Sequence, residues 1–190
     1  RGPKVLSSRP MKWASAISQQ VRLESALKEC AEGVRTQLGE APVDFAALFV
    51  SDNFAGRYEE AHALLADRLA VKTLIGASGG GVIGDGQEVE HRPAVSLVAA
   101  RLPKVRVRPF SVQDEDLPDL DASPRAWESI VGVRAGEDPQ FLVLADPFSI
   151  RSDNFLLGLD YAFPKSAKIG GLASGASEPG RNALYLNNLC

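Results

Sequence analysis

Two stretches of this sequence repeat the same order of features without a gap, and this repeat limits the possible folds more than any other feature. Each stretch contains an apolar run, a helical pattern and a glycine-rich segment, and the second stretch lies 96 positions after the first. The apolar runs begin at Phe45 and Phe141, and Ala77-Ser78-Gly79 recurs as Ala173-Ser174-Gly175. The repeat therefore predicts an α/β fold made of internally duplicated βαβ halves.

The two halves are expected to share one mixed sheet that is flanked by helices. We place half one at about residues 12–112 and half two at about 123–190, within one α/β domain over residues 11–190. A predicted strand at 183–186 corresponds to 94–97, but the second copy lacks the closing strand that is expected in the first. Half two is therefore expected to be incomplete and to leave an open sheet edge for a protein partner.

Hydrophobic periodicity predicts the individual helices and strands. Apolar residues at steps of three and four predict a first helix that ends at Gly39. Its buried face is expected to consist of Leu23, Ala26, Leu27, Cys30, Ala31, Val34 and Leu38. Further helices are predicted at 58–69, 125–133 and 152–163, and strands at 12–18, 45–50, 72–75, 94–100, 105–110, 141–146 and 183–186.

Two of these predictions concern chain reversals. The strands at 94–100 and 105–110 are expected to form a hairpin around Pro103. The glycine-rich segment at 76–81 is expected to be a turn or a loop in which the backbone lies close to another group. Four glycines in six residues would cost a strand or helix too much backbone entropy.

The composition is that of a soluble globular protein and argues against two classes of partner. Hydrophobic residues make up 45% of the chain and charged residues 24%. The 21 basic and 24 acidic side chains create no overall positive field, so we expect no nucleic-acid partner. No apolar run reaches the roughly 18 residues of a membrane-spanning helix, so no transmembrane segment is expected.

The cysteines and histidines indicate neither a disulfide framework nor a metal site. Cys30 and Cys190 have no metal-ligand spacing, and Cys30 is expected to be a buried apolar residue in an intracellular, reducing compartment. His62 and His91 have no carboxylate or cysteine at ligand spacing. No metal and no cofactor are therefore expected.

The amino-terminal residues have an unusual order of charges. Five basic residues precede the first acidic residue, Glu24, and several serines lie among them. Residues 1–10 can therefore be the remnant of an organellar transit peptide, which indicates a plastid protein, or a disordered solvated tail of a cytoplasmic one.

Two motifs suggest enzymes, and both lack the required context. Gly79–Gly84 fits G-x-G-x-x-G, but Asp85, Gly86 and Pro93 block the helix that a dinucleotide site needs. Ser78 lies in a G-x-S-x-G pattern, with His91 as the only candidate base and no well-placed acid. We therefore expect no catalytic residues, and a serine hydrolase is the less favoured alternative.

Small polar residues and glycines follow several of the predicted strands. Parallel α/β sheets bind ligands beyond the carboxyl ends of their strands, so these residues are the candidate ligand-binding set. The set consists of Ser51, Asp52, Asn53, Gly76, Ser78, Gly79, Gly80, Asp146, Gly171, Ser174 and Gly175. They suit a small polar ligand such as an amino acid, although the glycines can equally serve to pack the two halves together.

Three segments resemble a known family. Lys12-Trp13-Ala14-Ser15-Ala16, Ile75-Gly76-Ala77-Ser78-Gly79 and the stretch 169–175 are similar to the amino-terminal domain of the FIST family, over most of residues 11–188. The resemblance implies a sensory domain for small ligands, amino acids among them, without assigned catalytic residues. That family normally continues into a second FIST domain, which is not part of this sequence.

The sequence thus leads to one main functional hypothesis and one alternative. The main hypothesis is a non-catalytic, small-ligand-binding sensory domain. The alternative is a scaffold subunit of a larger plastid complex, which no longer binds a ligand and contacts its partners through the open sheet edge.

Overall fold

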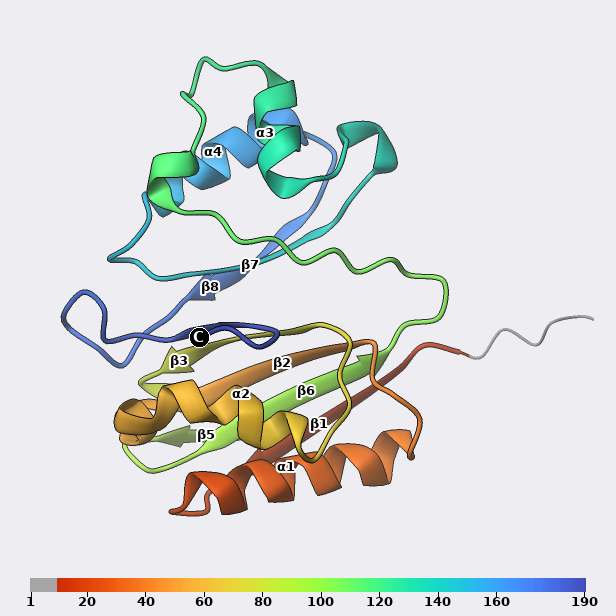
Figure 1. Cartoon of the computed structure of the whole chain (residues 1–190), viewed down its shortest axis with the longest axis vertical. Helices are drawn as coiled ribbons and strands as arrows, with labels where there is room; N and C mark the ends of the chain where they lie inside the picture. Colours follow the sequence, from red (N-terminus) through yellow and green to blue (C-terminus); the bar gives the residue numbers. More distant parts are fainter. Residues whose placement is uncertain (1–9) are drawn as a thin grey trace, which may run out of the picture.

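A mixed sheet of five strands organises residues 10–190, which are the residues that the computed structural model describes (Figure 1). The strand order is β1 (Lys12–Ser18), β6 (Val95–Arg101), β2 (Phe45–Ser51), β3 (Leu74–Gly79) and β9 (Leu184–Leu186). β2 and β3 are parallel, and the other neighbouring strands are antiparallel. The predicted α/β class with a mixed, helix-flanked sheet is confirmed.

Helices α1 (Leu23–Leu38) and α2 (Tyr58–Ala66) cover one face of this sheet (Figure 1). All seven residues of the predicted buried face of α1 are buried. They pack with apolar residues of all five strands and of α2 into the largest core of the protein. Because each buried leucine contributes roughly 1.5–3 kcal/mol to stability, this face holds α1 on the sheet.

A small hairpin covers part of the opposite face of the sheet. β4 (Gly81–Gly84) and β5 (Gln87–Glu90) pair with each other, and Val82 and Val89 pack against Ile17 and Phe49. Positive φ angles of 46° and 72° at Asp85 and Gly86 form the turn. An Asp-Gly pair between two segments of alternating hydrophobic and polar residues is a strong hairpin signal. The sequence contains this signal at Asp85-Gly86.

The predicted hairpin of residues 94–100 and 105–110 is wrong. Strand β6 forms, but residues 105–110 are not a strand. β6 lies between β1 and β2, and it is antiparallel to both. Since both of its edges are already paired, residues 105–110 have no free edge to join.

The prediction of a turn or loop at residues 76–81 is also wrong. Gly76 and Gly79 belong to β3, and Gly81 begins β4. A Cβ atom at Gly76 would lie 2.0 Å from the Leu48 carbonyl oxygen and 3.0 Å from the Tyr185 ring. Close backbone approach thus occurs inside the sheet rather than in a loop, and it explains why this position requires glycine.

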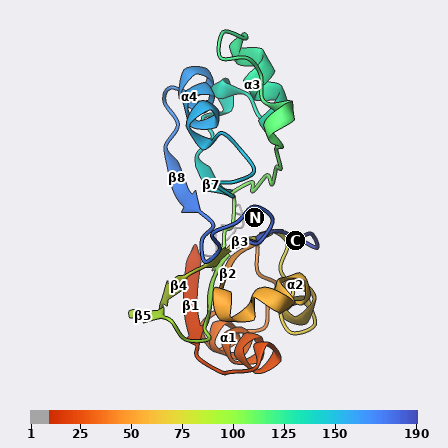
Figure 2. The same ribbon diagram turned by 90° about the vertical axis from the view of Figure 1, so that its left-hand side faces the viewer.

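The remaining elements form a second lobe around a parallel two-stranded sheet (Figure 2). This lobe contains β7 (Phe141–Ala145), β8 (Lys168–Leu172), α3 (Pro124–Val131) and α4 (Ser152–Ala162). Short 3-10 helices lie at η2 (Asp114–Asp116) and η3 (Ala135–Glu137), and a third, η1 (Asp52–Arg57), follows β2 in the first lobe. Trp127, Phe141, Phe155 and Phe163 form the centre of a separate core, against which Phe110 also packs.

The internal duplication stays a prediction. Both copies contain two parallel strands joined by a helix, β2-α2-β3 and β7-α4-β8. The strand pairing differs by one position, because Ala47 pairs with Ile75 whereas the equivalent Val143 pairs with Gly170. The cores also divide the chain differently from the predicted halves, since Tyr185 of half two lies in the core of the first lobe.

Two further predictions concern the amino-terminal residues and the absence of a membrane-spanning segment. The transit-peptide interpretation of residues 1–10 falls almost wholly outside the described residues. Within residues 10–190, no helix combines the length and the hydropathy needed to cross a membrane.

Substitution of Gly158 should destabilise the second lobe. Its Cβ atom would lie 2.1 Å from the ring of Trp127, which is fully buried. We expect Gly158→Ala to lower the free energy of unfolding by roughly 1–3 kcal/mol through overpacking. Urea denaturation measures this change. Gly136→Ala is the matched control, since no atom lies within 4 Å of its added Cβ, and equal losses for both variants would contradict the prediction.

Candidate functional site

The carboxyl ends of β2 and β3 lie where the chain returns from the second lobe, and this junction holds most of the candidate residues. Ser51 ends β2, and Asp52 and Asn53 follow in η1. Ser78 and Gly79 end β3, which runs parallel to β2, so both strand ends lie at the same edge of the sheet. The segment after β8 reaches the same place, as hydrogen bonds to Ser174 show.

Ser78 and Ser174 hydrogen-bond to each other across the junction. The Ser174 backbone N–H donates to the Ser78 carbonyl oxygen at 3.1 Å, and the Ser78 hydroxyl donates to the Ser174 carbonyl oxygen at 3.1 Å. The Ser174 hydroxyl accepts a hydrogen bond from the Gly80 backbone N–H at 3.2 Å. The two serines of the sequence repeat therefore hold the two lobes together.

Asn182 connects the same junction to the end of β7. Its amide nitrogen donates to the Asp146 carboxylate at 3.0 Å, and its amide oxygen accepts from the Ala176 backbone N–H at 3.2 Å. The Ser149 hydroxyl donates to the other carboxylate oxygen of Asp146. The Ser78 hydroxyl lies 3.4 Å from the amide oxygen of Asn182. Asn182, which the sequence did not point to, thus links Asp146 to Ser78.

Gly175 lies directly against η1. Its φ angle is 98°, and a Cβ atom there would be 2.7 Å from Cβ of Asp52 and 3.2 Å from the Gly79 carbonyl oxygen. Only glycine fits this position without strain or collision. The close approach places Asp52 beside the Ser78–Ser174 contact.

A family model described as the FIST N domain matches residues 44–189, which is more than half of the chain. The chain belongs to the FIST family. FIST domains are generally small-ligand-binding sensory domains. A search of curated proteins finds no match to this chain.

Two of the candidate residues lie away from the junction of this FIST domain. Gly76 lies inside β3, between Leu48 and Tyr185, where it serves backbone packing. Gly171 lies in β8, paired with Leu144 and exposed. The structure therefore brings together the strand ends, Gly80, Asp146, Ser174 and Gly175, but not these two glycines.

Two buried tyrosines beside the junction were missed from the sequence. Tyr58 begins α2, and Tyr185 lies in β9 opposite Gly76. Burial raises the pKa of both hydroxyls. At Tyr58 the Ser78 hydroxyl opposes this increase, whereas Asp52 and Cys190 add to it. The Tyr185 hydroxyl has no hydrogen-bond partner among residues 10–190.

Ser51 and Asn53 have a mainly structural arrangement. The Ser51 hydroxyl accepts from the Ala94 backbone N–H at 2.9 Å and donates to the Asn53 side-chain oxygen at 3.4 Å. Ser51 is buried, whereas Asn53 is exposed. These bonds fix the start of η1 and so fix the position of Asp52.

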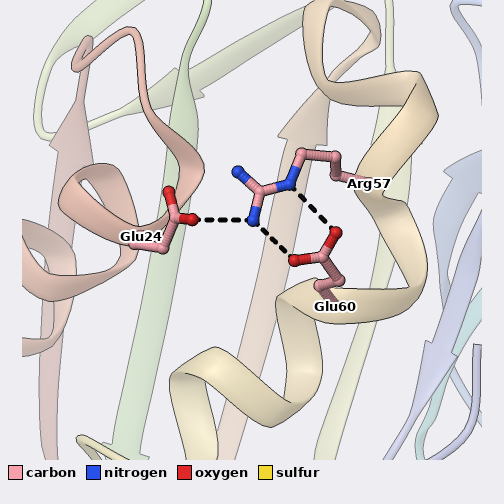
Figure 3. A network of polar contacts seen from close by, with 3 residues as sticks. All are labelled: Glu24, Arg57 and Glu60. Carbon is pink, nitrogen blue, oxygen red and sulfur yellow. Dashed lines mark hydrogen bonds and ion pairs between the residues drawn. The ribbon is translucent and has the colours of Figure 1, made fainter.

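Arg57 anchors the other end of η1 to both helices (Figure 3). Its guanidinium donates to Glu24 of α1 at 2.7 Å and to Glu60 of α2 at 2.5 and 3.0 Å. The hydrogen bond from Arg57 lowers the pKa of Glu24 from 4.5 to about 2. The same guanidinium holds the pKa of Glu60 below its usual value.

The alternative enzyme motifs do not have the geometry that their chemistry needs. A nucleophile elbow exposes its serine at a strand-to-helix turn, whereas Ser78 is 3% exposed within β3. The Ser78 hydroxyl also accepts a hydrogen bond from the Ala183 N–H at 3.0 Å. After Gly79 the chain enters the β4–β5 hairpin, so no helix opens for a dinucleotide. Residues 10–190 contain no group of three or more His, Cys, Asp or Glu that could hold a metal ion.

Cys30 is fully buried, as predicted, and its thiol lies 3.3 Å from the Val95 carbonyl oxygen. Loss of solvent raises the pKa of this thiol to about 12, and Glu29 adds to the increase. The thiolate fraction at neutral pH is therefore very small, as is typical of a buried structural cysteine.

Lowering the pH should remove the stabilisation that the ion pair between Glu24 and Arg57 provides. Because the pKa of Glu24 is about 2 in the folded chain and about 4.5 when unperturbed, the unfolded chain binds a proton first as the pH falls. Stability should therefore decrease between about pH 4.5 and pH 2, and this decrease should be smaller in Glu24→Gln. Urea unfolding at a series of pH values measures the slope. Glu59→Gln, an exposed neighbour on α2, should keep the wild-type slope.

Removal of the Ser78 hydroxyl should weaken the junction. Ser78→Ala leaves the buried Ala183 N–H without its acceptor, which costs roughly 1–3 kcal/mol of unfolding free energy. Ser129→Ala is the control, because its exposed hydroxyl bonds only within α3 and its loss should have little effect. Equal stability of the Ser78 variant and the wild type in urea would contradict this role.

Proposed function

We propose that this FIST domain binds a small polar ligand, without catalysing a reaction, at the carboxyl ends of β2 and β3. The observation that carries the proposal is the position of Asp52. Asp52 is a half-buried residue whose Cβ lies against Gly175, and its carboxylate accepts no hydrogen bond and forms no ion pair within residues 10–190. A carboxylate held by fixed backbone in a polar junction is free to receive a donor from a ligand.

The chemistry around Asp52 favours a ligand with an ammonium or hydroxyl group. Asn53 adds an exposed amide with both donor and acceptor atoms, and the Tyr58 hydroxyl lies close enough for Asp52 to affect its pKa. An ammonium group would form a charge-assisted hydrogen bond with Asp52. An amino-acid-like molecule combines these groups, and it is the ligand class that we propose.

In the proposed function, Ser78 is not a nucleophile. Its hydroxyl is buried and already serves the junction as donor and acceptor. No histidine is among its hydrogen-bond partners in the described part of the chain. We therefore assign Ser78 and Ser174 to holding the two lobes in place around the ligand.

The second candidate function is a scaffold subunit of a larger complex, in the plastid if residues 1–10 are a transit-peptide remnant. One observation favours it: Ser78, Ser174, Asn182 and Asp146 satisfy one another and leave few groups for a ligand. Such a subunit would migrate with an assembly on a native gel and would bind none of the small molecules tested.

Substitution of Asp52 tests the ligand proposal. Isothermal titration calorimetry against a panel of amino acids and related amines should find a ligand, and Asp52→Asn should weaken its binding about tenfold or more. The reason is the loss of a charge-assisted hydrogen bond, which contributes roughly 1.5–3 kcal/mol. Asp67→Asn removes the same charge at the other end of α2 and should leave the affinity unchanged.

Two results would contradict the proposal. One is a ligand whose affinity is the same for Asp52→Asn and the wild type, because it would bind elsewhere. The other is the absence of heat across the whole panel together with comigration in a large assembly, which would favour the scaffold function.

A further inference from the structure

The outer edge of β8 is unpaired. β8 pairs with β7 alone, and no described segment among residues 10–190 lies beyond it (Figure 2). Four of its five residues are exposed. A strand edge carries unpaired backbone N–H and C=O groups and is a template for a further strand.

The sheet formed by β7 and β8 also has one uncovered apolar face. Parallel sheets normally have both faces covered, and a pair of strands alone is only marginally stable. Here Phe141 faces the core with α3 and α4, whereas Leu142 and its pairing partner Ile169 lie on the other face. Leu142 is 42% exposed and Ile169 is 73% exposed.

The charge on this edge does not oppose self-association. Lys168 is the only charged residue of β8, and edge lysines commonly prevent two edges from pairing. Its side chain is 11% exposed, and its ammonium donates to Asp160 at 2.9 Å and to the Phe163 carbonyl oxygen at 2.6 Å. Because Lys168 is neutralised within the same copy, two β8 edges meet without repulsion between like charges.

We propose that β8 is a homodimer interface, in which the β8 edges of two copies pair antiparallel around a two-fold axis. The register that pairs the whole strand places Gly170 opposite Gly170 of the second copy, Ile169 opposite Gly171, and Lys168 opposite Leu172. In antiparallel pairs, opposite residues point to the same face, so the apolar faces of the two copies continue into each other. The dimer has a four-stranded sheet in the order β7-β8-β8-β7.

The side chains of β8 suit this register. A Cβ atom built on Gly171 meets no atom within 4 Å, so there is open space beside it. Ile169 of the second copy fills that space, and the two-fold axis repeats the contact at the other end of the strand. On this face the edge is self-complementary, because it has one large exposed side chain, Ile169, and one position without a side chain, Gly171, two residues apart.

Sedimentation velocity of the full chain tests the interface. A strand of five residues gives an interface at the small end of the range for specific complexes, so the dimer should dissociate on dilution between about 100 and 1 µM. Ile169→Lys should weaken dimerisation at least tenfold, because it places a charge on the apolar face. Ile83→Lys is the matched control, since Ile83 is an isoleucine in β4 with 70% exposure, and it should dimerise like the wild type.

Disulfide cross-linking tests the register independently. In a Cys190→Ser background, the double variant Ile169→Cys/Gly171→Cys should form a covalent dimer on mild oxidation. Each single variant should not, because its two cysteines would be diagonal, roughly 7–8 Å apart, which exceeds disulfide reach.

Each outcome decides the proposal. A wild-type chain that stays monomeric over the whole concentration range overturns it, as does a dimer that Ile169→Lys leaves intact or that both lysine variants weaken equally. Cross-linking of a single variant as efficient as that of the double variant overturns the register. Concentration-dependent dimerisation, sensitive only to Ile169→Lys and linked only in the double variant, supports it.

Discussion

The return of the chain from the second lobe to β3 is the contact on which the rest of this FIST domain depends. Without β9, β3 would be an edge strand, and Tyr185 would leave the core between the sheet and the helices. Ser174 and Asn182 continue the contact beyond the strand, so that β3, β7 and the candidate site share one set of hydrogen bonds. The geometry around Asp52 is therefore a product of both lobes, although Asp52 itself belongs to the first.

Local patterns in the sequence predicted most of the elements but not their neighbours. The face of α1 was predicted completely, because a helix packed on one side records its burial in steps of three and four residues. The pairing of residues 94–100 was mispredicted, because the alternation at 105–110 has the local form of a strand. The actual partners of β6 are β1 and β2, and strand pairing between distant segments leaves no local signal.

Sequence reasoning selected most, but not all, of the residues that meet at the junction of the two lobes. The repeat in the sequence led to Ser78 and Ser174, which are hydrogen-bonded to each other in the structure. Asn182 and Tyr185 were missed, because their roles depend on where the chain lies after the repeat has ended. The glycines were interpreted as turns on the basis of backbone entropy. At Gly76 the decisive factor is instead the distance to a neighbouring carbonyl oxygen, which sequence reasoning does not measure.

The pairing of β3 with β9 also has a kinetic consequence. Ile75 and Leu186 lie in the same ladder, so the sheet closes through a loop that contains the entire second lobe. During synthesis the earlier strands leave the ribosome long before β9 does, and the core residues that pack against Tyr185 lack this neighbour for that time. High contact order slows the final step, and the nascent first lobe is the species most exposed to aggregation and most in need of chaperones.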